Sequence, residues 1–505
     1  MKQPNILLLQ VDQLSAQSLA AYGDPVCVTP TLDRLANRGV VFERAYCNFP
    51  LCAPARFSMA SGRLPSAIGA YDNAAEFPAS IPSYAHHLRR RGYLTLLSGK
   101  MHFIGPDQLH GFERRLTPEL YPADFSWVPN WENEGKRDTN DARGVRTAGV
   151  CARSVQIDYD EAVAHKAEQQ LYDLARTKNE RPFFLQVSFT HPHEPFLCQQ
   201  GFWDLYEGKT IPLPRVGSPA EIQLDAHSRR LLQDFDMLGE RFTEEEVLRA
   251  RRAYYGSISY IDSLVARVLA ALKATGADKT TAVIFTSDHG EMLGERGLWF
   301  KKHFFERALR IPLLVYAPWL AAERRSELVS LVDLLPTLNG IADAQPWRDE
   351  SEQLDGEDLT GLLGRSGTSR ERSVYAEYLA EATPGPIVMI RRGRYKFVYC
   401  EHDPALLFDL ETDPDEMVNL AEAPEQAGAI AALRAEIDAR WNLPDLAQRV
   451  RHSQQQRLLI RGAMRQGQAA EWERTTTLSD TGQWYRGKGS YNDWAFNYLP
   501  VTENA

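Results

Sequence analysis

Side chains that could bind a metal ion, hold an anion or transfer a proton occur at several separated points of this 505-residue chain. Asp12 and Asp288 offer carboxylate oxygens, which are the ligands that Ca²⁺ and Mg²⁺ prefer. His102 and His193 carry imidazoles, which titrate near neutral pH and can act as acid or base. Cys52 adds a thiol, although a free cysteine is often a small buried hydrophobe, and Asp12 alone fits a helix N-cap. Chemistry requires that the fold bring these residues together.

Short apolar runs predict the strands that would do so. Apolar residues at helical spacing over 254–272 predict an amphipathic helix between them, so we expect an α/β fold with a large, mostly parallel sheet flanked by helices. The runs, all predicted as parallel strands, are 6–11, 94–97, 183–189, 282–286 and 312–316. In open sheets of this kind, ligands bind at the carboxyl ends of the strands. Polar residues follow four of the runs, and we expect one shared site from them: Asp12, Lys100 and His102, His191 and His193, and Asp288 and His289.

The pattern changes from about residue 370. Runs at 387–390, 395–399 and 406–410 predict a short antiparallel sheet, and helical patterns follow at 424–441 and 445–466. The last forty residues are rich in aromatic side chains, and we expect this extended tail to dock on its own subunit or on a neighbour. The predicted divisions are a catalytic domain over 1–370, a subdomain with the small sheet and a helix over 371–445, and a helix with the tail over 446–505. We expect this last segment to take part in oligomer contacts.

Composition narrows the class of protein. The formal net charge of −10 argues against a broad nucleic-acid footprint or an anionic membrane surface. The six cysteines are scattered without disulfide-dense spacing, which favours a reducing compartment. The apolar run at 5–11 is too short for a signal sequence or a membrane span, so we expect a cytoplasmic protein.

Two motifs carry a family resemblance. Cys52-Ala-Pro-Ala-Arg56 is a C-x-P-x-R pattern, and 286–301 reads S-D-H-G, then L-G, then G-L-W-x-K. In this order and separation they resemble the signatures of type I sulfatases. Further segments at 29–36, 98–100, 192–195, 332–337 and 407–414 extend the resemblance from residue 4 to about 420. The fold that it implies is that of the alkaline phosphatase superfamily.

The resemblance implies a nucleophile and a set of metal ligands. Cys52 would be oxidised to formylglycine by a formylglycine-generating enzyme, and the hydrated aldehyde would be the nucleophile. One divalent cation, Ca²⁺, Mg²⁺ or possibly Mn²⁺, would be held by Asp12, Asp288, His289 and the residue derived from Cys52. Many relatives have a second Asp where this chain has Gln13, whose amide oxygen can still ligate but carries no charge.

The resemblance also assigns the steps of catalysis. Arg56, one helical turn after Cys52, would hydrogen-bond the diol. Lys100 and Lys301 would hold the sulfate oxygens, with Lys301 rather than Lys302 selected by the W-x-K spacing. The diol would attack sulfur, His193 would assist the leaving alcohol, and His102 would help to expel sulfate and restore the aldehyde. His191 lies two residues from His193, and on an extended segment both would face the same side, so His191 is a further candidate for substrate contact or for the role of His193.

Segments at 122–127, 376–381 and 388–393 look most like the choline sulfatases of this family. A trimethylammonium head requires an aromatic face and carboxylates, for which Trp127, Glu381 and Glu377 are the candidates, although Trp127 also fits ordinary packing. Asn140 stands where that group has a histidine. Choline sulfatases form tetramers in which the tail reaches a neighbour's pocket, so the tail offers further candidates: Asp493, Trp494 and Phe496.

The sequence therefore predicts a sulfatase for a small sulfate ester, with choline-O-sulfate as one candidate, in a homo-oligomer, dimer or tetramer. Three alternatives stay open. The first is another small alkyl, aryl or sugar sulfate as the ester. The second is a phosphonate monoester or phosphodiester hydrolase of the same superfamily. A binding protein that never converts Cys52 would keep the same metal pocket.

Overall fold

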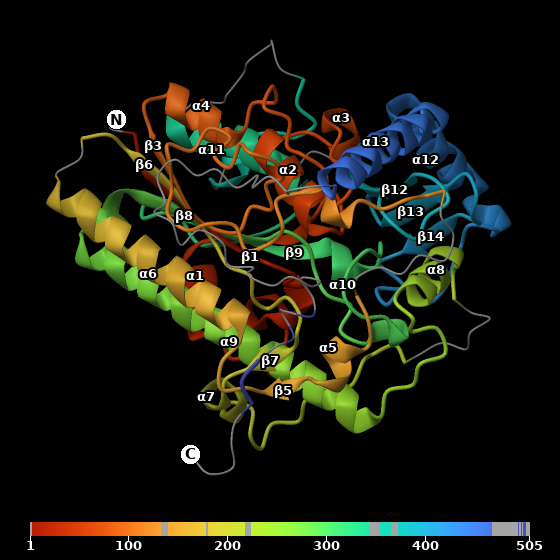
Figure 1. Cartoon of the computed structure of the whole chain (residues 1–505), viewed down its shortest axis with the longest axis horizontal. Coiled ribbons are helices and arrows are strands. Elements are labelled where there is room, and N and C mark those ends of the chain that lie inside the picture. Colours follow the sequence, from red (N-terminus) through yellow and green to blue (C-terminus); the bar gives the residue numbers. More distant parts are fainter. Residues whose placement is uncertain are drawn as a thin grey trace.

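The computed structural model describes residues 3–132, 140–177, 180–217, 224–343, 353–364, 372–466, 493, 496 and 498–500. Its large sheet has the strand order β10-β2-β9-β8-β1-β6-β3-β4 (Figure 1). The strands are β1 (Asn5–Val11), β2 (Val40–Tyr46), β3 (Leu94–Gly99), β4 (Arg114–Arg115), β6 (Phe183–Ser188), β8 (Thr281–Ser287), β9 (Arg310–Tyr316) and β10 (Glu323–Ser330).

The centre of this sheet is parallel, as predicted: β1 pairs with both β6 and β8, and β6 pairs with β3. The prediction of a parallel strand at 312–316 is wrong, because β9 runs antiparallel to β8 and β2. A parallel connection requires a crossover element that returns the chain along the sheet. Residues 288–309 contain only short helical turns, the longest being α10 (Glu306–Leu309), so the chain returns in the opposite direction.

Apolar residues on both faces of the strands separate two layers of helices. Along β1, Ile6 and Leu8 belong to one core while Leu7 and Leu9 belong to the other, as the alternation of side chains across a strand dictates. The first core includes residues of α2 (Cys52–Ser61), α4 (Tyr84–Arg90) and α11 (Leu334–Asp343). The second includes residues of α1 (Pro30–Arg38), α6 (Val155–Arg176) and the long α9 (Glu244–Ala274), which lie together on one side of the sheet (Figure 1).

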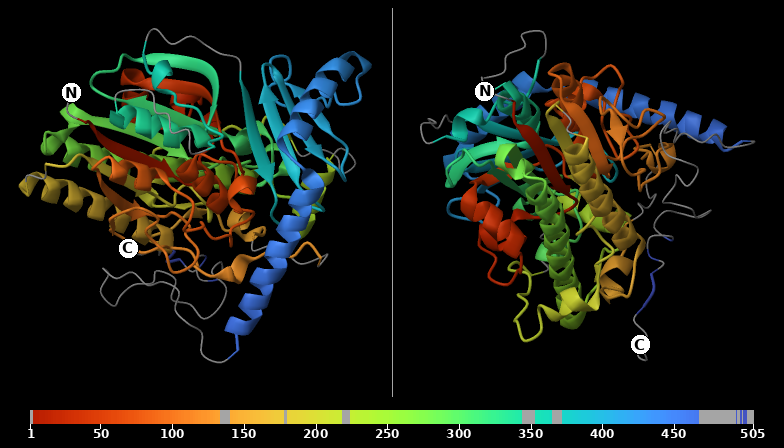
Figure 2. Two further views of the ribbon diagram at one scale, coloured as in Figure 1. Left: turned by 90° about the horizontal axis from the view of Figure 1, so that it is seen from above. Right: turned by 90° about the vertical axis from the view of Figure 1, so that its left-hand side faces the viewer.

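A separate four-stranded antiparallel sheet has the order β11-β12-β13-β14 (Figure 2). Its strands are β11 (Ser373–Tyr378), β12 (Ile387–Arg392), β13 (Tyr395–Cys400) and β14 (Leu406–Asp409). The antiparallel pairing of β12, β13 and β14 was predicted, whereas β11 was missed. The helices α12 (Ala427–Arg440) and α13 (Leu443–Met464) follow, and the first core contains residues of both sheets. The predicted domain divisions stay predictions.

Short elements complete the described chain: α3 (Pro65–Ile68), α5 (Arg143–Arg146), β5 (Gly149–Val150), β7 (Leu197–Cys198), α7 (Gln200–Asp204) and α8 (Ala226–Asp234). The described part of the tail lies against its own chain, where Leu499 bridges to Arg153. Of the helices in the described ranges, none is long and apolar enough to cross a membrane.

Candidate active site

The four strands that precede the predicted site residues are neighbours in the sheet, in the order β8-β1-β6-β3. Their carboxyl ends therefore meet at one edge, and Asp12, Lys100 and Asp288 are the first residues after β1, β3 and β8. Gly99 allows this convergence, because a Cβ at that position would lie 1.9 Å from the carbonyl oxygen of Ser188. The predicted shared edge is confirmed.

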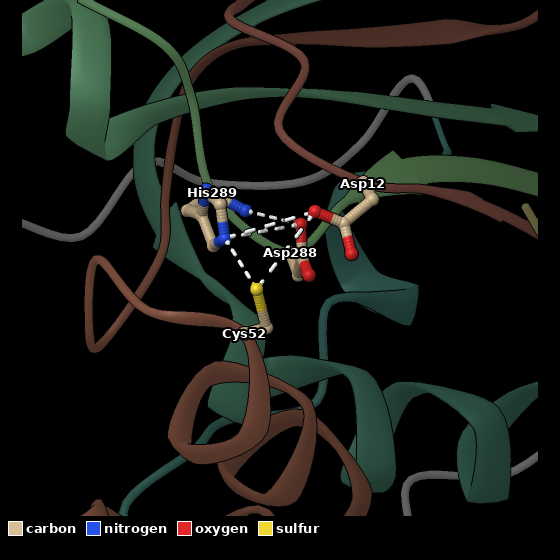
Figure 3. A group of neighbouring side chains, drawn as sticks. All are labelled: Asp12, Cys52, Asp288 and His289. Carbon is tan, nitrogen blue, oxygen red and sulfur yellow. Dashed lines mark hydrogen bonds and ion pairs between the residues drawn. The ribbon is translucent and has the colours of Figure 1, made fainter. Parts of the chain in front are cut away.

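Four buried side chains form a group that can hold a metal ion: Asp12, Cys52, Asp288 and His289 (Figure 3). His289 Nε2 lies 3.3 Å from Cys52 Sγ, 3.9 Å from Asp12 Oδ1 and 3.8 Å from Asp288 Oδ1. Cys52 Sγ lies 3.9 Å from Asp12 Oδ1. Donor atoms that share one cation at about 2.3–2.6 Å have separations of this size. Two carboxylate oxygens and an imidazole therefore fit the single cation that the resemblance implies.

Arg56 organises the two carboxylates from one helical turn beyond Cys52. The helix α2 begins at Cys52, and the Arg56 guanidinium donates to Oδ2 of Asp12 and to Oδ2 of Asp288, both at 2.9 Å. Each carboxylate thus uses one oxygen for Arg56 and directs the other toward Cys52 and His289. Arg56 also donates to the carbonyl oxygen of Lys100 at 2.7 Å, which ties α2 to the end of β3. The side chain that the resemblance assigned to the diol therefore pairs with the two metal-binding carboxylates.

The ammonium groups of Lys100 and Lys301 flank this group. Lys100 forms an ion pair with Asp12, and its Nζ lies 3.9 Å from the ring centroid of Tyr121. Burial would raise the pKa of Asp12, but the positive charges around it, led by Lys100, hold that pKa well below its usual value. Lys301 donates to Gln13 Oε1 at 2.6 Å, and its Nζ lies 2.7 Å from His193 Nε2. Two buried cations are therefore in place for an anion.

His102 presents an imidazole whose two nitrogens have no hydrogen-bond partner within the described ranges. Burial, and then the charge of Lys100, hold the pKa of His102 well below its usual value, so its ring is neutral. The Glu119 carboxylate accepts a hydrogen bond from its backbone N–H at 2.7 Å and fixes its position. The ring centroid lies 5.0 Å from that of Tyr121 and 5.6 Å from that of Trp127. A neutral base is thus held beside an aromatic surface.

His191 and His193 do not face the same side. Residues 190–193 form a turn, in which the His193 N–H donates to the Thr190 carbonyl oxygen, so the extended geometry assumed for them is wrong. His191 Nδ1 lies 2.7 Å from the Asp160 carboxylate of α6, and its ring packs edge-on against Tyr260 of α9. His193 is the histidine that reaches Lys301.

Gln13 links Lys301 to two buried carboxylates. Its amide nitrogen donates to the carboxylates of Glu194, at 2.6 Å, and Glu291, while its oxygen accepts from Lys301. Because that oxygen is engaged by an ammonium, we leave Gln13 out of the metal site proposed below. Burial, and then the charge of Glu194, raise the pKa of Glu291 to about 7.

The candidates for the alcohol end of the substrate lie on several segments. Asn140 donates to Glu194 Oε1 at 2.6 Å, and Glu381 Oε1 lies 2.5 Å from Lys302 Nζ. Glu377 is not brought to them: it is fully buried beneath Ser66 and Trp441, whose side chains donate to its carboxylate. We therefore withdraw Glu377 as a substrate ligand.

The tail residues that the structure describes contact α5, which borders this region. Asp493 forms an ion pair with Arg143 at 3.0 Å, and the Arg143 guanidinium lies 5.0 Å from the ring centroid of Phe496. The next residue of α5, Gly144, faces Phe300 and Glu194, since a Cβ there would lie 3.5 Å and 3.8 Å from them. Trp494 lies outside the described residues.

Comparison with known proteins places the whole arrangement. Residues 4–344 match the sulfatase family, and residues 294–442 match the C-terminal family of N-sulphoglucosamine sulphohydrolase. The chain is 43% identical over 485 residues to a choline-sulfatase of Rhizobium meliloti (strain 1021), a match that covers 93% of each chain. It is 26% identical to an arylsulfatase of Clostridium perfringens (strain 13 / Type A), over 86% of this chain and 93% of that one. The chain belongs to the sulfatase family.

This sulfatase hydrolyses sulfate esters. Its fold is alkaline-phosphatase-like, as predicted, and resembles that of the phosphonate monoester hydrolase of Agrobacterium radiobacter. The TM-score is 0.69 over 86% of this chain and 95% of that one, at 24% identity. A likeness at this identity shows the fold, while the family match shows the reaction.

Sequence reasoning missed several residues of the sulfatase site. Glu194 lies within a segment that matched the family, and Glu291 directly follows the S-D-H-G motif, so both had a signal that went unused. Glu119 and Tyr121 follow no motif; only the fold places them against His102.

Four residues of the site have a strained backbone. Gln13, His102, Phe300 and Lys302 have φ values of 65°, 63°, 66° and 77°, in a region that side chains other than glycine rarely adopt. Such strain persists only where surrounding contacts enforce it. Here it directs the segments around Asp12, Lys100 and Lys301 toward one centre.

Proposed function

We propose that this sulfatase hydrolyses the sulfate ester of a small alcohol with a formylglycine formed from Cys52 and one divalent cation. The observation that carries the proposal is the position of Cys52. Cys52 is the first residue of α2, and its Sγ lies 3.3 Å from His289 Nε2 and 3.9 Å from Asp12 Oδ1. The side chain to be converted therefore lies among oxygen and nitrogen donors that suit a divalent cation. The proposed cation is Ca²⁺, Mg²⁺ or Mn²⁺.

When present, the formylglycine diol supplies a nucleophile with a second hydroxyl, and the cation supplies Lewis acidity. The remaining work falls to the side chains of the chain. Lys100 and Lys301 would bind sulfate oxygens, on which negative charge grows in the transition state. Arg56 pairs with Asp12 and Asp288 and orients them for the cation.

Two histidines would transfer protons. His193, held at Lys301, would give a proton to the departing alcohol oxygen. His102, neutral and with both ring nitrogens unoccupied among the described residues, would take the proton that sulfate release requires. His191 belongs to a structural contact with Asp160 and has no part in this scheme.

Choline-O-sulfate is the first candidate substrate, because a relative with 43% identity is named a choline-sulfatase. Trp127 lies beside His102 and offers an aromatic face, with Glu381, Asn140, Asp493 and Phe496 as further contacts. We also propose maturation by a formylglycine-generating enzyme, a cytoplasmic location, and a dimer or tetramer.

The test combines mass spectrometry and turnover. Protein co-expressed with a formylglycine-generating enzyme should carry the aldehyde or its hydrate at residue 52. It should also release sulfate from a panel of choline, alkyl, aryl and sugar sulfates, with activity lost to a chelator and restored by Ca²⁺ or Mg²⁺. A converted enzyme that cleaves phosphonate monoesters faster than every sulfate ester would overturn the proposed substrate class.

A further inference from the structure

Lys302 forms an ion pair with Glu381, the carboxylate on which recognition of a cationic alcohol would depend. Its side chain is only 2% exposed, and its Nζ lies 2.5 Å from Glu381 Oε1 and 3.3 Å from Asn140 Oδ1. The same ammonium lies 4.8 Å from the ring centroid of Phe235. The residue beside the sulfate-binding Lys301 therefore introduces a second buried positive charge, directed to the alcohol end.

The backbone holds Lys302 in this position. Its φ of 77° lies in a region that residues other than glycine rarely adopt. Its N–H donates to the Pro50 carbonyl oxygen at 2.9 Å, and its own carbonyl oxygen lies 2.7 Å from His227 Nε2. One contact ties it to the segment before Cys52 and the other to α8, so Lys302 is a fixed part of the site.

A short series of contacts connects Lys302 to the reacting end. Asn140 accepts from Lys302 and donates to Glu194 at 2.6 Å, and Glu194 Oε1 lies 3.4 Å from Lys301 Nζ. Lys301 in turn reaches His193, the proposed proton donor to the alcohol. Two hydrogen-bonded side chains, Asn140 and Glu194, therefore connect the Lys302–Glu381 pair to Lys301 and the groups that surround the leaving alcohol.

A quaternary ammonium would meet two obstacles at this pair. It has no N–H, so it cannot replace the charge-assisted hydrogen bonds that Lys302 gives to Glu381 and Asn140. Its positive charge would also be repelled by a buried ammonium, where Coulomb energies exceed those in water. An uncharged alcohol meets neither obstacle, because it leaves the pair intact.

We propose that Lys302 is a specificity-determining residue that disfavours a trimethylammonium head and favours the sulfate ester of an uncharged small alcohol. This inference rests on the proposed sulfate-ester hydrolysis, and it replaces choline-O-sulfate, the first candidate on sequence identity alone, by an uncharged ester. The class of substrate would thus differ from that in the name of the choline-sulfatase relative, although the sulfate chemistry is the same.

The test compares two esters of the same shape: choline-O-sulfate and 3,3-dimethylbutyl sulfate, in which carbon replaces the charged nitrogen. Their ratio of kcat/KM isolates the effect of charge, since any general loss at the reacting centre cancels. The wild type should favour the uncharged ester. Lys302→Met, which removes the charge from an unbranched side chain, should shift the ratio toward choline by roughly tenfold or more.

Two further variants complete the design. Lys302→Arg keeps the charge and should keep the wild-type ratio. Adding Glu381→Gln to Lys302→Met should cancel the gain, because the released carboxylate is what would attract the cation. A wild type that prefers choline-O-sulfate, with a ratio that Lys302→Met leaves unmoved, would overturn the inference.

Turnover of 4-nitrophenyl sulfate distinguishes a failure of the role of Lys302 from a failure of the proposed function. Converted enzyme that cleaves this aryl ester while the ratio fails to move would refute the role of Lys302 alone. Converted enzyme that cleaves no sulfate ester would refute the proposed function itself.

Discussion

The two ends of the site are built differently. At the sulfate end, Asp12, Arg56, Lys100 and Asp288 are fully buried and paired with one another, and they lie at the ends of central strands or one turn into α2. At the alcohol end, the side chains come from loops and short helices, and the pairs reach solvent. The Glu381 side chain is 20% exposed and that of Asp493 is 65% exposed. The reaction is therefore fixed by many mutually dependent contacts, whereas selectivity depends on a few residues that can change independently.

The largest expected effect is at the nucleophile. Cys52→Ala removes the precursor of the diol and should lower kcat/KM by about 10⁵-fold or more, as loss of a nucleophile does elsewhere. Cys47→Ala is the matched control, because Cys47 is also a buried free thiol but contacts Ala308 rather than the site. Assays of both purified proteins on one sulfate ester compare them. Equal activity in Cys52→Ala and wild type would refute the role of residue 52.

Removal of Arg56 should expose the dependence between groups at the sulfate end. Arg56→Ala leaves two carboxylates buried together and should cost about 3–5 kcal/mol of unfolding free energy. A divalent cation neutralises the same carboxylates, so Ca²⁺ or Mg²⁺ should restore part of the loss. Urea unfolding with and without the cation measures both effects.

Arg457→Ala is the control for that experiment. Arg457 of α13 also forms a buried pair, with Asp72, at 2.6 Å and 2.7 Å. Its removal should destabilise the protein without any cation-dependent recovery. Equal recovery in both variants would show that the cation binds elsewhere.

A smaller effect is expected at His102. His102→Gln should lower kcat by about 10²-fold or more, the usual contribution of a general base. Burial and Lys100 lower the pKa of His102, so the wild-type ring stays neutral well below pH 6.5. The acid side of the kcat profile should therefore fall only as pH drops through this lowered pKa, and the fall should vanish in the variant.

His110 offers the comparison for His102. In the described part of the chain its ring nitrogens also have no hydrogen-bond partner, although Nδ1 lies 3.3 Å from the Asp107 carboxylate, and burial lowers the pKa of His110 to about 4. It packs against Phe77 and Phe103 rather than against the site. His110→Gln should keep kcat and its pH profile; an identical loss in both variants would contradict a proton-transfer role for His102.

The same contrast explains what the sequence could predict. Asp12, Lys100 and Asp288 were placed together because buried parallel strands end at one edge, a rule that depends only on pattern and topology. The partners of Gln13, His191 and Lys302 could not be read in this way. Each is set by a local turn or a positive φ that directs the side chain toward residues far along the chain. Lys302 was set aside by motif spacing, and only its contact with Glu381 gives it a role.

The smallest expected effect is at Trp127, where the alcohol end meets the sulfate end. Its ring lies 5.6 Å from His102 and 5.3 Å from Tyr121, so it can serve either as packing or as a face for a cation. A cation over a partly exposed tryptophan gains about 0.5–2 kcal/mol. Trp127→Leu should therefore lower kcat/KM for choline-O-sulfate by roughly threefold to thirtyfold. The uncharged 3,3-dimethylbutyl ester should lose less, because it keeps only the packing. Equal losses for both esters would assign Trp127 to packing, and the alcohol end would then distinguish charge through the Lys302–Glu381 pair alone.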